Sequence, residues 1–74
     1  MSTQDLRLEY PPSLLSRPVI QELIRGFDIS VNILQAQITL EEGWIAVRLS
    51  GEDAEIERAL NWLRAEGLGV RPLD

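Results

Sequence analysis

The amino-acid sequence predicts an α+β fold in which strands and helices follow one another in the order βαββαβ. Four segments alternate between apolar and polar residues, as half-buried strands do, and two further segments carry apolar residues at helical spacing. The length is a third observation, because 74 residues are enough for one domain with a thin core. We therefore expect a single domain over residues 1–74, with residues 1–3 disordered.

The first half of the chain predicts a strand, a helix and a second strand. Residues 4–10 alternate between apolar and polar side chains, and a pair of prolines ends this strand. Residues 17–26 carry apolar side chains at the i, i+3 and i+4 spacing of a helix that buries one side. Residues 29–40 read as a long strand, and the short turn after them predicts an antiparallel hairpin.

The second half repeats the order of strand, helix and strand. Residues 44–50 alternate again and form the second arm of the hairpin. Residues 51–66 predict a helix with Ser50 as its N-cap and with acidic residues in its first turn, where the helix dipole favours them. Gly67 is a typical helix stop, and residues 68–73 follow as a last short strand.

This order of elements has an economical solution in one four-stranded antiparallel sheet with two helices on one face. This is the ferredoxin-like arrangement. Because the two crossover connections must be right-handed, the first and third strands take the centre of the sheet and the second and fourth lie at its edges. The long strand over residues 29–40 is therefore expected to be an exposed edge.

The edge strand changes the phase of its alternation halfway along. Apolar residues occupy odd positions up to Ile33 and even positions from Leu34 onward. Pairing Thr39 with Trp44 across the hairpin sets the even-numbered apolar residues against apolar residues of the next strand. The odd-numbered ones then allow two interpretations. Either a bulge near residues 32–34 turns them into the same core, or they form an interaction surface on the open face.

The composition excludes several classes of function. The net charge is −5, and the chain has no Lys, no Cys and no His. The chain thus lacks disulfides, the usual ligands of zinc and haem, and the side chains that most often act as nucleophile or base. Its acidic charge also disfavours binding to nucleic acid. No apolar run approaches the roughly 18 residues that span a membrane. We expect a cytoplasmic protein that is not an enzyme, holds no metal or cofactor, and associates with a second copy.

The chain resembles the NIL domain family along essentially its whole length. The resemblance is carried by the triplet that names the family and by four further motifs: Asn32-Ile33-Leu34, then Pro18-Val19-Ile20, Gly43, Leu49-x-Gly51 and Ala59-x-x-Trp62-Leu63. NIL domains are small ferredoxin-like, ACT-like modules that occur at the C-terminus of methionine-importer ABC ATPases, fused to ferredoxin modules, and alone. In the transporters, the domain pairs with its twin and binds L-methionine at the paired surface, which lowers transport when methionine is plentiful.

The resemblance implies a small regulatory module that senses L-methionine or a similar amino acid at a homodimer surface. Asn32 matches the motif asparagine that helps to hold the ligand, Ile33 and Leu34 match the apolar pair after it, and Ala36 matches a small position. With Val31, these are the candidate ligand-binding or interface residues. The chain has no P-loop, so an ATPase would have to be another chain. The alternative is an interaction or oligomerisation module with an unidentified protein partner and no small ligand.

Overall fold

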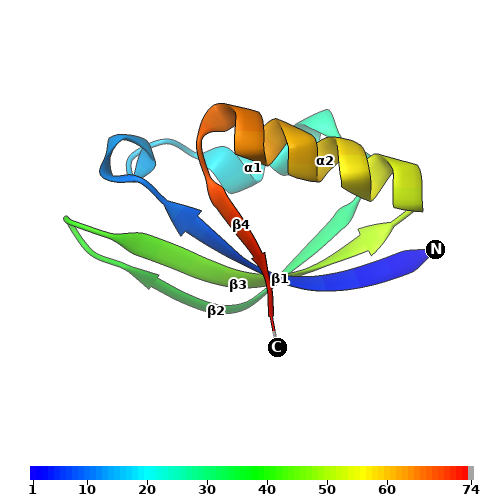
Figure 1. The fold of residues 1–74 in the computed structure, drawn as a ribbon, viewed down its shortest axis with the longest axis horizontal. Coiled ribbons are helices and arrows are strands. Elements are labelled where there is room, and N and C mark those ends of the chain that lie inside the picture. The colour runs from blue at the N-terminus through cyan, green and yellow to red at the C-terminus, as the bar shows by residue number, and fades with distance from the viewer. Residues whose placement is uncertain (74) are drawn as a thin grey trace.

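The computed structural model describes residues 1–73 and shows one sheet with a layer of helices on a single face (Figure 1). The elements are β1 (Ser2–Tyr10), a short 3-10 helix η1 (Pro12–Leu14), α1 (Val19–Gly26), β2 (Ser30–Ile38), β3 (Gly43–Gly51), α2 (Asp53–Glu66) and β4 (Gly69–Pro72). The strand order is β2-β3-β1-β4, and each neighbouring pair is antiparallel. The predicted ferredoxin-like βαββαβ fold is confirmed, with β2 and β4 at the edges.

The core lies between the two helices and the inner face of the central strands. Strand side chains alternate between faces, so every second residue of β1 and β3 points to the helices. The buried cluster consists of residues from both central strands, both helices and the start of the last connection: Leu6, Leu8, Val19, Leu23, Ile45, Val47, Leu49, Ile56, Ala59, Leu60, Leu63 and Leu68. No element of the described part of the chain covers the opposite face of the sheet, as Figure 1 shows. Within residues 1–73, no helix is long and apolar enough to cross a lipid bilayer.

The sheet extends further at one end than the sequence predicted. β1 begins at Ser2, which pairs with Gly51 of β3, and Thr3 pairs with Ser50. These partners give the first residues a ladder to join, so the expectation of disorder is corrected for residues 2 and 3. The same extension places Ser50 within β3 rather than at the helix N-cap, and α2 begins later than predicted, at Asp53.

Local rules explain where the helices begin and end. α1 starts two residues later than predicted because Arg17 precedes Pro18, and a residue before proline is disfavoured in helical conformation. α2 ends at Gly67, whose φ of 106° lies in the left-handed region that glycine adopts without strain. There the backbone N–H of Leu68 donates to the carbonyl of Leu63 at 3.1 Å, which closes the end of the helix.

Arg17 ties the start of α1 to the end of α2. Its Nε and Nη2 atoms donate to the two carboxylate oxygens of Glu22, each at 2.8 Å, and Nη2 also donates to Oε1 of Glu66 at 2.5 Å. Forked pairing of this kind fixes geometry as well as charge. The hydrogen bonds from Arg17 hold the pKa of Glu22 below its usual range.

Acidification is therefore expected to weaken the fold. Because the pKa of Glu22 is lower in the folded chain than in the unfolded one, its ion pair stabilises the fold fully above the unfolded pKa of about 4.3. That stabilisation is lost as the pH falls through the folded value. The pKa of Asp5 is also lowered, by hydrogen bonds from Arg48. We expect the melting temperature to fall as the pH drops from about 5 to about 3.

The Arg17→Met variant tests the part of this pH dependence that comes from Glu22. We expect its melting temperature to fall less steeply with acid than that of the wild type, because the low pKa of Glu22 depends on Arg17. Arg25→Met, at an exposed arginine of α1, the helix that carries Glu22, is the control and should keep the wild-type slope. Thermal melts followed by circular dichroism measure both. Equal slopes for the two variants would contradict the role given to Arg17.

Candidate functional site

β2 forms one edge of the sheet. The backbone on its outer side, away from β3, pairs with no other strand of residues 1–73. Every residue from Asn32 to Leu40 is exposed. The large apolar side chains of this stretch keep about half of their surface or more in solvent: Ile33 53%, Leu34 43%, Ile38 56% and Leu40 98%. Exposed apolar groups on a long edge strand mark a surface suited to pairing with another chain.

The change of phase in the sequence is a β-bulge. β2 pairs with β3 residue by residue through Ile33, and the pairing resumes at Gln35, so Leu34 is the extra residue. The extra residue puts Val31 and Ile33, which precede it, on the same inner face as Ala36, which follows it. The bulge interpretation is confirmed. The alternative, in which the odd-numbered apolar residues occupy the open face, was wrong.

The hairpin register differs by two residues from the prediction. We expected Thr39 opposite Trp44, whereas Gln37 takes that position. Thr39 belongs to the turn instead, because its hydroxyl accepts the backbone N–H groups of Glu41 and Glu42 at 3.2 and 3.1 Å. A shift of two residues keeps every side chain on its face. The prediction that even positions after the bulge face the core therefore remains correct.

The five candidate site residues are neighbours along β2 but do not share a face. Asn32 lies on the open face of the sheet, whereas Val31, Ile33 and Ala36 lie on the inner face. Leu34 sits at the bulge between them. One copy of the domain does not gather these side chains around a single point. A ligand or partner that touches all of them has to reach across the strand edge.

A polar row crosses the open face at Asn32. Asn32 of β2 is the cross-strand partner of Arg48 of β3, and Arg48 is the partner of Asp5 of β1. The Nε and Nη2 atoms of Arg48 donate to the two carboxylate oxygens of Asp5 at 2.8 and 2.9 Å. These bonds lower the pKa of Asp5 and raise that of Arg48, so both are charged at neutral pH. This row was not predicted from the sequence, because the expected register of the hairpin placed Gln35, not Asn32, beside Arg48.

The open face next to this row has more arginines than acidic residues among residues 1–73. The guanidinium carbon of Arg7 lies 4.4 Å from the centroid of the Trp44 ring, and Nη2 of Arg71 lies 2.7 Å from a carboxylate oxygen of Glu9. Among the described residues 1–73, this face thus carries three arginines but only two acidic residues. An anionic group meets less repulsion here than elsewhere on a chain of net charge −5.

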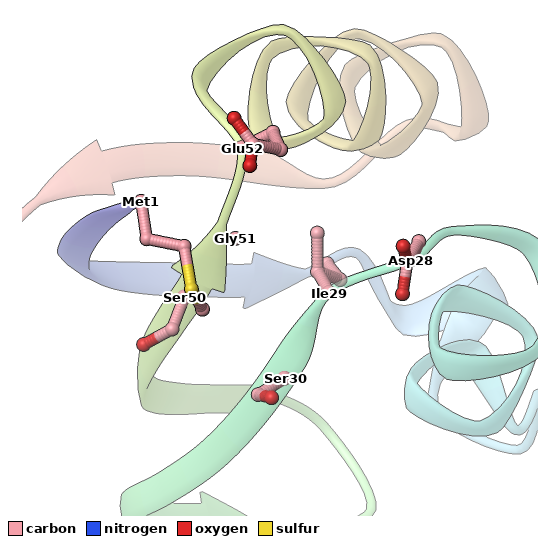
Figure 2. A pocket seen from close by; sticks show the side chains of 7 residues that line it. All are labelled: Met1, Asp28, Ile29, Ser30, Ser50, Gly51 and Glu52. Carbon is pink, nitrogen blue, oxygen red and sulfur yellow. The ribbon is translucent and has the colours of Figure 1, made fainter.

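Two hollows lie at the two ends of β2. One has a volume of about 200 Å³, and Figure 2 shows its lining: Met1, Asp28, Ile29, Ser30, Ser50, Gly51 and Glu52. The other has about 370 Å³, lies between the segment after β1 and the hairpin turn, and is lined by Pro12, Leu15, Ser16, Ile38, Thr39 and Leu40. Neither hollow is lined by any of the five candidate residues. The candidate site is thus a stretch of exposed strand between two hollows.

Comparison with known protein families identifies the family to which this chain is related. The family model described as the NIL domain matches residues 4–72, almost the whole chain. The chain belongs to the NIL domain family. The predicted resemblance is therefore confirmed, and the bulge falls within the three residues that name the family.

Curated relatives of this NIL domain are much longer proteins. The methionine import ATP-binding protein MetN of Helicobacter pylori is 41% identical over 76 residues, which cover 96% of this chain and 23% of that protein. The methionine import ATP-binding protein MetN 1 of Paraburkholderia xenovorans is 36% identical over 72 residues, 92% of this chain and 21% of that protein. The chain thus spans about a fifth of the length of these relatives.

Solved structures share the fold of this NIL domain. The crystal structure of the C-terminal domain of an ABC transporter ATP-binding protein from Enterococcus faecalis matches 95% of this chain and 82% of that chain, with a TM-score of 0.82. The sequence identity is 22%, so the likeness establishes the fold alone. A de novo designed protein, Foldit4, also matches, with a TM-score of 0.58 at 15% identity.

Proposed function

We propose that this NIL domain is a regulatory binding module that recognises L-methionine or a similar small amino acid at a surface formed by two copies. The observation that carries the proposal is the exposed, bulged edge strand at the family's own motif, where apolar groups remain uncovered. The names of the relatives support the choice of ligand, because they are methionine import ATP-binding proteins.

The chemistry of the β2 edge fits an amino acid with an apolar side chain. Two copies that meet along β2 would satisfy unpaired backbone groups and bury Ile33 and Leu34. A thioether chain is flexible and polarisable, so it fills the irregular gap that a bulge leaves. The amide of Asn32 donates and accepts at once, so it can hold either polar group of the ligand.

We propose binding rather than catalysis, since the chain lacks the side chains that most often act as base or nucleophile. We further propose that the domain works in the cytoplasm and that its protein partner is an ATPase. The names of the relatives support this partner, because they are methionine import ATP-binding proteins.

The Asn32→Ala variant is expected to abolish the response to methionine. For the wild type, L-methionine at 100 times its Kd should raise the free energy of unfolding by about 2.7 kcal/mol. The variant should lose this increase, and its stability without ligand should change by less than about 0.5 kcal/mol because Asn32 is exposed. Gln37→Ala removes another exposed amide from the same face of β2 and is the matched control. Urea unfolding followed by tryptophan fluorescence measures all three.

The same experiment separates the two candidate functions. If saturating L-methionine leaves the free energy of unfolding of the wild type unchanged, the sensing function is ruled out. The exposed apolar edge alone supports the second candidate, an oligomerisation module without a small ligand. Sedimentation with and without methionine distinguishes them, because this second candidate predicts a dimer whose stability is independent of methionine. A monomer under both conditions would exclude either function in the form proposed.

A further inference from the structure

We propose that Arg48 and Asp5, next to Asn32, bind the two charged groups of the ligand's amino-acid head. This inference rests on the proposed function and makes it more specific: the ligand is a free α-amino acid, with its carboxylate on Arg48 and its ammonium on Asp5. Neither residue belongs to the motif of the family as it stands in this sequence. The pairing of β2 with β3 and of β3 with β1 places both residues in one row with Asn32 of the motif.

The position of the row suits a zwitterion. The row runs across three adjacent strands, whose spacing of about 4.8 Å gives it a length of roughly 10 Å. The carboxylate and the ammonium of an amino acid sit on the same carbon, so they need a cationic donor and an anionic acceptor side by side. Arg48 and Asp5 are such a neighbouring pair, and Asn32 adds an amide at the end of the row nearest the edge.

Arg48 keeps donors free for a carboxylate. A guanidinium carries five N–H donors, and Asp5 accepts from Nε and Nη2. Within residues 1–73, the structure records no other side chain as a hydrogen-bond or ion-pair partner of Arg48, which is 48% exposed. The edge formed by Nη1 and Nη2 therefore has no recorded protein partner at Nη1 among residues 1–73, and two parallel N–H donors of this kind match a carboxylate.

Asp5 can accept an ammonium while it holds Arg48 in place. Its side chain is 34% exposed, and each carboxylate oxygen accepts one bond from Arg48 and has a further lone pair. The surrounding charge favours this location for a ligand carboxylate. The polar hollow in Figure 2 has two carboxylates, of Asp28 and Glu52, and no arginine among its lining residues, so it would repel that group.

The pair makes only a small contribution to the stability of the fold. Exposed ion pairs contribute little to the free energy of unfolding. The core side chains of β1 and β3 lie on the other face of the sheet. Variants at Asp5 and Arg48 should therefore fold, and their binding can be measured.

The test compares L-methionine with two analogues by isothermal titration of the wild-type protein. L-Methioninamide lacks the carboxylate, and N-acetyl-L-methionine lacks the ammonium. We expect each analogue to bind at least about 10-fold more weakly than L-methionine, since each loses a charge-assisted contact. Arg48→Gln should weaken L-methionine to the level of the amide, and Asp5→Asn should weaken it to the level of the acetylated form. Arg71→Gln, at another ion-paired arginine of the open face, should leave all three dissociation constants unchanged.

The outcomes separate this inference from the proposed function. If the wild type binds L-methionine but does not discriminate against the analogues, or if Arg48→Gln binds it as tightly as Arg71→Gln, the inference is overturned and the proposed function stands. If the wild type binds no L-methionine, the proposed function fails and the inference fails with it. The analogue series uses unmodified protein, so its result does not depend on the folding of any variant.

Discussion

Leu8→Ala is expected to lower the free energy of unfolding by about 3 kcal/mol, within the range of about 2–5 kcal/mol for removing a buried leucine side chain. Leu8 has no exposed surface and belongs to β1, a central strand of the sheet. Its cross-strand neighbours on the inner face are Ile45 of β3 and Val70 of β4. A cavity at this point removes contacts to both neighbouring strands at once, and these are regular ladders that cannot close the gap without losing their pairing.

The size of this effect matters because small domains have little stability to lose. A total of about 5–15 kcal/mol is usual for folded proteins, and a short chain lies toward the lower end. Urea titration followed by tryptophan fluorescence gives the change. Leu40→Ala, at a leucine that is 98% exposed in the hairpin turn, is the control and should stay within about 0.5 kcal/mol of the wild type. Equal losses for the two variants would contradict the placement of the core.

The fold could be predicted because its signals are local. Residues 4–10 alternate cleanly, and the two amphipathic helices can be recognised from spacing alone. The handedness of the crossovers then leaves one economical order of strands, which the structure confirms. The errors arose where long-range pairing decides. Ser50 is chemically suited to cap a helix, but Thr3, 47 residues away, pairs with it and keeps it in β3.

The candidate site could be predicted only in part for the same reason. The phase switch at Leu34 revealed the bulge, since the alternation within one strand records it. The side chains that share a face with Asn32 depend on the register across the hairpin, which Thr39 shifts by two residues through its turn hydrogen bonds. The partnership of Arg48 with Asp5 joins positions 43 apart in sequence. No local pattern signals it.

Deletion of Leu34 is expected to leave the fold intact and to abolish methionine recognition. Without the extra residue, the alternation of β2 would run unbroken, with Val31, Ile33 and Ala36 on the inner face. The ladder with β3 would become regular, and Leu34 is already 43% exposed, so little buried surface is lost. We expect the free energy of unfolding to change by less than about 1 kcal/mol.

Recognition should respond quite differently from stability. A bulge bends its strand and increases the local twist, so its removal would straighten the edge that a second copy or a ligand has to fit. The measurements are the melting temperature with and without L-methionine and the sedimentation profile. Leu34→Ala is the matched control, because it keeps the extra backbone residue and removes only the side chain. It should retain a weakened methionine response, whereas the deletion should show none.

This comparison decides what the bulge is for. If the deletion variant folds and still responds to methionine as Leu34→Ala does, then the bulge only places the apolar residues of both halves of β2 on the inner face. The irregular backbone then has no part in recognition. If the deletion variant folds without responding, the extra residue costs the strand a regular ladder and is retained for binding. A bulge whose only role is packing predicts that the deletion variant still responds to methionine, because the regular strand packs the same side chains on the inner face. Loss of the response in a folded deletion variant would therefore contradict a role in packing alone.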